Sequence, residues 1–287
     1  MNYSALIQNR KSVREFTNKK VAASALAEIE GYYQKSCQRL IPDLETELYV
    51  FGEETKEALE GAAGYQSFLI GAPQYLILLS AKDVYAGENA GYIMEDLVLK
   101  LTDMDLGSCW LTFSDSEQVK KALNITSPLD VAAIVAFGYG VKTTKRLRLN
   151  VLSMSNVDIS AQRQYFAPKH GIHDMVFMNS WGNCDGVDEF IGFYDDMLWE
   201  ALYAATLSPS YLNRQPYGFI IHDDGITLVQ TPDSHTGEID GKLDLGIVLL
   251  HFTSVAAQWA GKITWHFEET SKLQLPEGYM AVASCAL

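Results

Sequence analysis

Two short basic windows stand out in a chain of 287 residues with a formal net charge of −14. They hold seven of its 22 lysines and arginines: Arg10, Lys11 and Arg14 in the first, and Lys142, Lys145, Arg146 and Arg148 in the second. The planar guanidinium group suits phosphate oxygens, and Ser12 adds a hydroxyl donor to the first window. The windows suggest an anion site, although a short basic motif taken alone is more often solvated surface or a partner of carboxylates.

A second group of polar residues lies in the segment Leu207-Ser-Pro-Ser-Tyr-Leu-Asn-Arg-Gln-Pro-Tyr217. Small hydroxyls, the amides of Asn213 and Gln215, and two prolines predict a rigid loop that presents donors and acceptors to a planar heterocycle. The alternative is an ordinary turn after a helix, in which the same side chains cap backbone groups. In a third segment, Asp105–Phe113, Gly107 takes the position expected just after the end of a helix.

Metal chemistry and a protein nucleophile are not indicated. His170 and His173 have a spacing that suits a metal and Cys184 follows nearby, but without a fourth ligand they are better interpreted as polar linker residues. No Ser-His-Asp or Cys-His arrangement has a recognisable context. We therefore expect no metal site and no catalytic side chain.

Composition narrows the class of protein. A hydrophobic content of 48% supports a substantial core, and the excess of 36 acidic over 22 basic residues argues against nucleic acid or an anionic membrane as partner. The N-terminal residues do not resemble a targeting signal, and the four cysteines are scattered. The sequence predicts a cytoplasmic protein with free thiols, no membrane partner and a small-molecule substrate.

Hydrophobic periodicity predicts helices over Ala90–Leu106 and Asp244–Ala260, and short apolar runs predict strands at Glu47–Phe51, Tyr75–Ser80, Val131–Gly138 and Phe219–His222. Further helical runs are Ala22–Tyr33 and Asp188–Ala205. Gly91 precedes Trp110 by the same interval that separates Gly246 from Trp265, which suggests a duplication. We expect a first half at 1–150, a linker at 151–186 and a second half at 187–287.

Four motifs together resemble the nitroreductase family of FMN enzymes: Arg10-Lys-Ser-Val-Arg14, Asp-Leu-Gly-Ser-Cys-Trp, Phe-Gly-Tyr-Gly, and Ser-Pro-Ser-x-x-Asn-x-Gln-Pro. The resemblance implies an α+β fold: a three-layer α/β/α sandwich with mixed, mainly antiparallel sheets flanked by helices, and two related halves in one chain. Family members usually place the last motif soon after the first, and build each site from two subunits. Here Ser36–Pro42 has lost that motif and the second half has kept it. The pattern predicts a single-chain pseudo-dimer with one FMN, either a monomer or a weak homodimer.

The resemblance also implies roles. The FMN phosphate and ribityl chain would be held from the first half, the ring edge by Arg14 and by backbone groups, and the flavin from the other side by the second half. The implied residues are Arg10, Lys11, Ser12, Arg14, Thr112, Phe113, Arg146, Arg148, Pro209, Ser210, Asn213 and Gln215. Where the family often has glycine, this chain has Thr112-Phe113.

The implied activity is an NAD(P)H-dependent oxidoreductase of the nitroreductase type, in which flavin N5 carries hydride to a nitroaromatic, a quinone or a similar electron-poor molecule. Arg14 would tune the ring rather than act as a catalytic acid or base. The alternative is a flavin-binding protein of the same fold without NAD(P)H turnover: a flavin store, or a flavin-consuming or dehalogenating relative.

Overall fold

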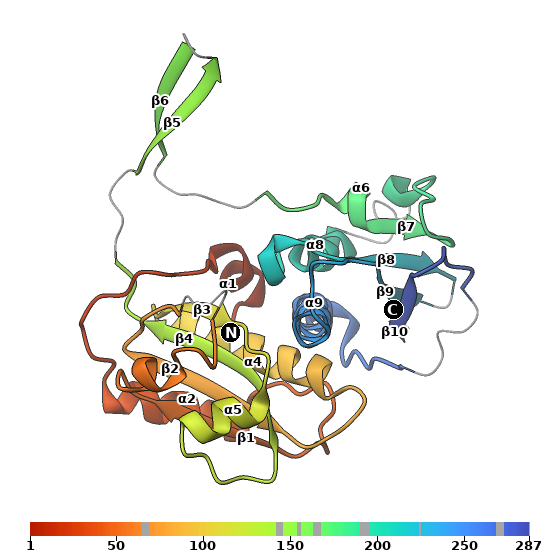
Figure 1. The fold of residues 1–287 in the computed structure, drawn as a ribbon. Coiled ribbons are helices and arrows are strands. Elements are labelled where there is room, and N and C mark those ends of the chain that lie inside the picture. Colours follow the sequence, from red (N-terminus) through yellow and green to blue (C-terminus); the bar gives the residue numbers. More distant parts are fainter. Residues whose placement is uncertain are drawn as a thin grey trace.

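The computed structural model describes residues 1–64, 69–141, 146–153, 156–162, 168–189, 196–223, 225–267 and 273–286, with the backbone alone in 146–162. Its first half contains α1 (Tyr3–Asn9), α2 (Ala23–Lys35), β1 (Thr46–Phe51), α3 (Thr55–Leu59), β2 (Gln74–Ser80), α4 (Ala86–Asp103), β3 (Gly107–Leu111), α5 (Ser116–Ala122) and β4 (Asp130–Gly138). The four strands form an antiparallel sheet in the order β1-β2-β4-β3 (Figure 1).

Both faces of this first sheet are covered by helices. Because side chains alternate along a strand, Leu76 and Leu78 of β2 face α2 and α4, whereas Tyr75 and Ile77 pack with residues of α3 and α5 on the opposite face. All four are fully buried. The first half is therefore the helix–sheet–helix sandwich that the resemblance implies.

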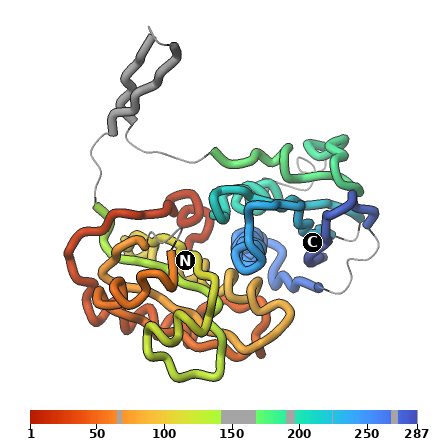
Figure 2. Tube along the Cα trace, in the orientation of Figure 1, coloured from red at the N-terminus to blue at the C-terminus, as the bar shows by residue number. Residues whose placement is uncertain are grey.

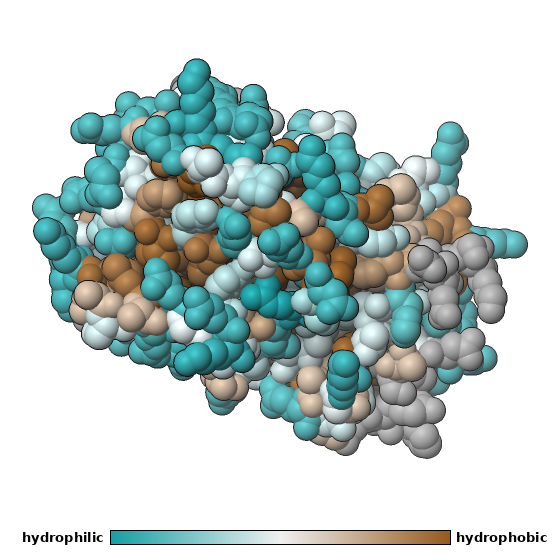
Figure 3. All heavy atoms as spheres, turned by 90° about the horizontal axis from the view of Figure 1, so that it is seen from below, coloured by the Kyte–Doolittle hydropathy of each residue, from teal (hydrophilic) through white to brown (hydrophobic). Residues whose placement is uncertain are grey.

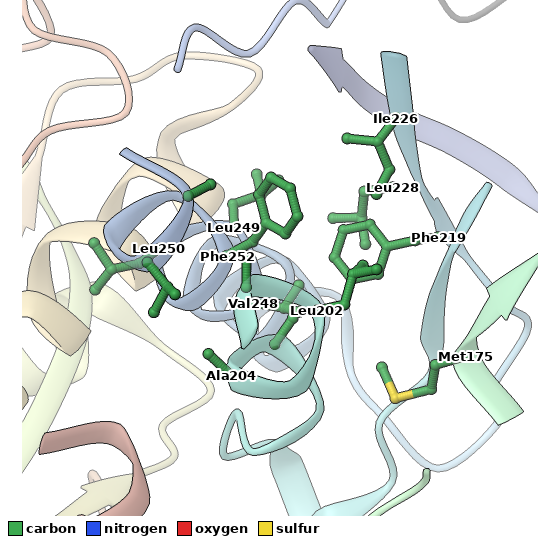
Figure 4. Packing of buried hydrophobic residues seen from close by; sticks show 14 of the residues in the cluster. Met175, Leu202, Ala204, Phe219, Ile226, Leu228, Val248, Leu249, Leu250 and Phe252 are labelled. Carbon is green, nitrogen blue, oxygen red and sulfur yellow. The ribbon is translucent and has the colours of Figure 1, made fainter. Parts of the chain in front are cut away.

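The second half contains α6 (Ile172–Met175), β7 (Val176–Met178), α8 (Asp196–Thr206), the short 3₁₀ turn η1 (Tyr211–Asn213), β8 (Tyr217–His222), β9 (Gly225–Gln230), α9 (Glu238–Ala260) and β10 (Met280–Cys285). Its sheet has the order β10-β9-β8-β7, and β7 lies parallel to β8. Figure 4 shows Phe219 and Leu228 of the sheet facing Phe252 of α9 and Leu202 of α8. In the described part, residues of loops rather than helices pack on the other face: Trp181, Leu273, Leu275 and Tyr279.

The two halves meet where α4 and α9 pack against each other, and α9 lies at the centre of the molecule (Figures 1 and 2). A Cβ atom on Gly91 would collide with the carbonyl oxygen of Leu243, and one on Gly246 with that of Glu88. These contacts are reciprocal: each glycine touches the backbone of the residue three positions before the other glycine. Such reciprocity is expected of a two-fold relation, and it supports the duplication suggested by the matched Gly–Trp intervals.

Strand order shows the same relation. His266, shortly after α9, forms an isolated antiparallel bridge with Ser284 of β10, just as β3, shortly after α4, pairs with β4. The orders β1-β2-β4-β3 and β8-β9-β10-His266 therefore correspond, and β7 is an addition at the outer edge of β8.

The segment predicted as a linker, 151–186, is more structured than a linker. It contains most of a hairpin formed by β5 (Arg146–Ser153) and β6 (Asn156–Gln162), and it contains α6 and β7. Val176 of β7 is buried in the second core. The division into halves at 1–150 and 187–287 stays a prediction, but β7 belongs to the second sheet although it precedes residue 187.

The surface and the one long apolar helix agree with a globular protein. α9 is the only described helix long and apolar enough to cross a membrane, and 78% of its apolar window is buried inside the protein, as in a core helix. Figure 3 shows one face of the molecule, where hydrophilic side chains surround separate hydrophobic patches.

Candidate functional site

The basic segment Arg10–Arg14 follows α1 and lies along the edge of the first sheet. Ser12 forms a parallel bridge with Ser108 of β3, and the Val13 amide donates to the Ser108 carbonyl at 2.8 Å. Lys11 and Arg14 are exposed, whereas the Arg10 side chain is only 8% exposed. The segment thus presents two cations outward and turns one inward.

Arg10 points to a buried carboxylate. Its Nε lies 3.6 Å from Glu95 Oε1 on α4 and has no hydrogen-bond partner among the described residues. Glu95 Oε2 accepts from Trp110 Nε1 at 2.9 Å, and Oε1 lies 3.0 Å from His251 Nε2 on α9. Glu95 and His251 are both fully buried. A first-half carboxylate is therefore held by a second-half imidazole.

Hydrogen-bond geometry indicates where this cluster holds its protons. His251 Nδ1 lies 3.1 Å from the Ala204 carbonyl oxygen, which only accepts, so Nδ1 donates. Nε2 and Glu95 Oε1 must share a further proton, because two bare acceptors would repel each other. The Glu95 carboxyl and the His251 imidazole are therefore joined by one shared proton across the boundary between the halves.

Lys169 links this region to the second-half loop. Its Nζ donates to the Ser208 carbonyl at 2.7 Å. Burial lowers the pKa of Lys169 to about 8, helped by the positive charge of Arg10 and opposed by Asp244 and Glu95. Arg10 of the first half therefore lies close enough to Lys169, which is bonded to the second-half loop, for their charges to interact.

Two carboxylates near the start of α9 form a second connection between the halves. Asp240 Oδ2 accepts from Thr112 Oγ1 of the first half at 2.9 Å. One turn later, both oxygens of Asp244 accept from the Tyr211 amide at 3.0 Å. Burial raises the pKa of each carboxyl, and the neighbouring Asp240 adds to the effect on Asp244. Thr112 and the loop are thus fixed to the same end of α9.

The second-half loop is held in an unusual backbone conformation. Leu212, Asn213 and Gln215 all have left-handed φ values, 48°, 58° and 48°. For residues other than glycine, such values cost on the order of 1–3 kcal/mol each and concentrate at functional sites. The surrounding bonds hold the loop in place: the Gln215 amide donates to Ser210 Oγ at 2.9 Å, and Asn213 Nδ2 donates to the Pro168 carbonyl at 2.7 Å.

Gln215 faces inward. It is 4% exposed, its Nε2 donates to the Thr206 carbonyl at 2.9 Å, and its Oε1 accepts from the His170 amide. Pro209 is buried too, and so is Phe113, whereas Ser210, Thr112 and Asn213 are half-buried. The side chain of Gln215 shapes the loop from within, and the backbone amide of His170 helps to hold it there.

The residues expected from sequence thus fall into three groups. Arg10 and Thr112 lie close to residues of the second half, and Lys11, Ser12 and Arg14 lie in the same segment as Arg10, along β3. Pro209 and Gln215 are buried in the second half, and the side chains of Arg146 and Arg148 lie outside the described residues. Among the described residues, no group of three or more histidines, cysteines or acidic residues has metal-binding geometry.

Sequence reasoning missed several residues of the boundary: Glu95, Lys169, Asp240, Asp244 and His251. The signal for Glu95 and His251 was their position among the buried apolar residues of α4 and α9, the two longest described helices, where a charge needs a partner. Lys169 and Asp240 carry no such signal, because nothing in their neighbourhood in the chain distinguishes them from surface residues.

The donor set suits a phosphorylated, planar anion such as FMN. Cations and hydroxyl groups line the first-half side, and a rigid loop lies opposite. The buried Nε atom of Arg10 has no hydrogen-bond partner among the described residues. Such atoms are rare in native proteins and indicate an absent ion, water or ligand group. The residues therefore fit FMN, with Arg10 partly engaged by Glu95.

Comparison with known proteins gives a consistent result. A family model described as "Putative TM nitroreductase" matches residues 2–170 and 186–256. The solved structure of a putative nitroreductase from Thermotoga maritima is similar over 100% of this chain and 94% of its own, with 19% identity and a TM-score of 0.60. At that identity the likeness shows the fold. Among curated proteins, none matches the chain.

Other solved structures match about half of the chain. An FMN-dependent nitroreductase from Clostridium difficile is 20% identical and covers 48% of this chain and 88% of its own, with a TM-score of 0.42. An iodotyrosine deiodinase bound to FMN and 3-iodo-L-tyrosine is 21% identical and covers 54% of this chain and 98% of its own, with a TM-score of 0.41.

Proposed function

Because the chain belongs to the family described as putative TM nitroreductases, we propose that it is a flavoenzyme with one FMN between its halves, which oxidises NAD(P)H and reduces an electron-poor small molecule such as a nitroaromatic or a quinone. The observation that carries this proposal is the double connection at the boundary. Thr112 of the first half donates to Asp240 of the second. Arg10 of the first half lies close enough to Lys169 to lower its pKa, and Lys169 donates to the Ser208 carbonyl of the second-half loop.

Within this proposal the first half holds the anionic end of the cofactor. Lys11 and Ser12 bind the phosphate together with Arg10, whose Nε lies 3.6 Å from Glu95 Oε1 but has no hydrogen-bond partner among the described residues. Arg146 and Arg148 add to this end if their side chains follow the family pattern. A fixed cation close to a phosphate gives short, strong, charge-assisted hydrogen bonds.

The ring end is shaped by Arg14, by the backbone at Thr112 and Phe113, and by Ser210 and Asn213 of the loop. Bound FMN supplies the two-electron chemistry between NAD(P)H and the acceptor. Arg14 stabilises the negative charge that accompanies reduction, because a preorganised cation acts without further reorganisation. Pro209 and Gln215 keep the loop rigid, so that its donors stay aimed at the boundary.

The free, scattered cysteines support a cytoplasmic location. The two halves already bury a shared interface through α4 and α9, which supports a monomer.

Anaerobic stopped-flow mixing with NADH and NADPH tests the activity. We expect the flavin absorbance to bleach with at least one nicotinamide and to return on addition of a quinone. A flavin-loaded protein that bleaches with neither donor would refute the reductase and leave a flavin-binding protein without NAD(P)H turnover.

A further inference from the structure

The corresponding edges of the two sheets differ, because a further strand pairs with one of them and no described strand pairs with the other. The outer edge of β8 is covered by β7, with Val176, Phe177 and Met178 paired in parallel to Phe219, Ile220 and Ile221. By the correspondence of strand order, the equivalent edge in the first half is that of β1. No described strand pairs with that edge. β1 therefore presents unpaired backbone N–H and C=O groups, which readily pair with another extended chain.

A cavity of about 460 Å³ runs along this edge. It is lined by Glu30, Tyr33 and Gln34 of α2 and by Glu47, Leu48 and Tyr49 of β1. Side chains of successive strand residues point to opposite faces. Glu47, Leu48 and Tyr49 are successive, so they line one cavity only if the cavity follows the edge of β1 rather than one of its faces. The cavity therefore corresponds in position to β7, which lies beside the edge of β8.

The lining of the cavity contains two carboxylates and no cation, and Arg39 lies beside it, stacked on the Tyr33 ring and donating to Thr46 Oγ1 at 2.7 Å. Neither Glu30 nor Glu47 forms an ion pair with a described residue; Glu47 Oε2 accepts only from the Tyr49 hydroxyl, at 2.9 Å. Glu45, Glu53 and Glu54, just outside the strand, are exposed and add to the negative charge. Acidic residues around an open edge disfavour its pairing with a second copy of a chain that carries a net charge of −14.

We propose that the open edge of β1 is a docking site for an extended, basic segment of a partner protein, which adds as a parallel strand. The backbone of β1 supplies the hydrogen bonds, and the acidic cavity takes lysine or arginine side chains at alternate positions of the partner. Strand addition of this kind combines main-chain affinity with side-chain specificity. The site is separate from the flavin boundary and does not depend on the proposed redox activity.

The probe is a labelled eight-residue peptide of alternating lysine and valine; a peptide with glutamate in place of lysine is its control. Binding is measured by fluorescence anisotropy, and hydrogen exchange followed by NMR reports on the amides of residues 46–51. We expect the lysine peptide alone to bind and to slow exchange at those amides. A double reversal, Glu30→Lys with Glu47→Lys, should weaken binding about tenfold, whereas Glu117→Lys on distant α5 should not.

Three results would overturn the proposal. The glutamate peptide binds as well as the lysine peptide; or the lysine peptide binds without slowing exchange in β1; or the β1 amides become protected only as the protein concentration rises, which would make a second copy the occupant. Far-ultraviolet circular dichroism of the reversal variant shows whether it is folded, and NADPH oxidation tests the flavin boundary independently.

Discussion

Replacement of Gly246 by alanine tests how the halves are joined. A Cβ at this position would lie 2.8 Å from both the Glu88 carbonyl carbon and the Tyr92 amide nitrogen, 0.6 Å short of the 3.4 Å at which ordinary contact begins, and closer still to the Glu88 oxygen. These are backbone atoms of α4, so no side-chain rotation relieves the overlap. α4 and α9 must separate, and a gap of 0.5–1 Å already forfeits a quarter to a half of the dispersion attraction between facing atoms.

The expected loss follows from two opposing effects. Overpacking costs about 1–3 kcal/mol, and alanine gains about 1 kcal/mol over glycine in a helix. Because the contact is backbone against backbone, we take the upper end of the overpacking cost. The expected net effect is a loss of about 2 kcal/mol in the free energy of unfolding, measured by urea denaturation. Gly31→Ala in α2 is the matched control: a Cβ there meets no atom within 4 Å, so the same exchange should stabilise by about 0.5–1 kcal/mol. If both variants are stabilised equally, the close crossing of α4 and α9 is wrong.

Three further predictions concern charges at the boundary. Glu95→Leu removes the partner of the buried Arg10 guanidinium and should lower the free energy of unfolding, measured by urea denaturation, by about 3–5 kcal/mol. Glu117→Gln breaks an exposed pair and should lower it by under about 0.5 kcal/mol. Equal losses would contradict the buried cluster. Burial lowers the pKa of Lys169 from 10.5 to about 8. Because the folded chain loses this proton at a lower pH than the unfolded chain, the free energy of unfolding should rise between pH 8 and pH 10.5 by on the order of 3 kcal/mol. The Lys169→Met variant should lack this rise, and parallel pH profiles of the variant and the parent would refute the shift. Arg14→Gln should lower the two-electron potential of bound flavin by about 30 mV, measured by dye equilibration. The potential of Arg14→Lys should lie closer to that of the parent. An unchanged potential in Arg14→Gln would show that Arg14 does not interact with the flavin ring.

Much of the fold follows from patterns within the sequence. Apolar runs predict β2, β4 and β8 within two residues at each end, because buried strands carry continuous Ile, Val and Leu. Helix α9 begins at Glu238, six residues before its predicted start at Asp244, because its first turns are polar and lack the periodic stripe. β7 was missed: three residues are too few to show a period, and the strand exists only because β8 lies beside it.

The candidate site divides in the same way. Its motifs were recognisable as local sequence, but which side chains point outward depends on tertiary contacts. Gln215 belongs to the expected motif and yet donates to the Thr206 carbonyl inside the second half. Glu95 and His251 are far apart in the chain, and their 3.0 Å contact exists only because α4 and α9 cross. No local pattern encodes such a contact.

The most direct test of the central claim is the visible absorbance spectrum of the purified protein, with the amount of FMN released on denaturation. A single site between the halves predicts flavin absorption bands and about one FMN per chain. Two per chain would contradict the single site, and a colourless protein that also fails to bind added FMN would contradict the flavin site itself.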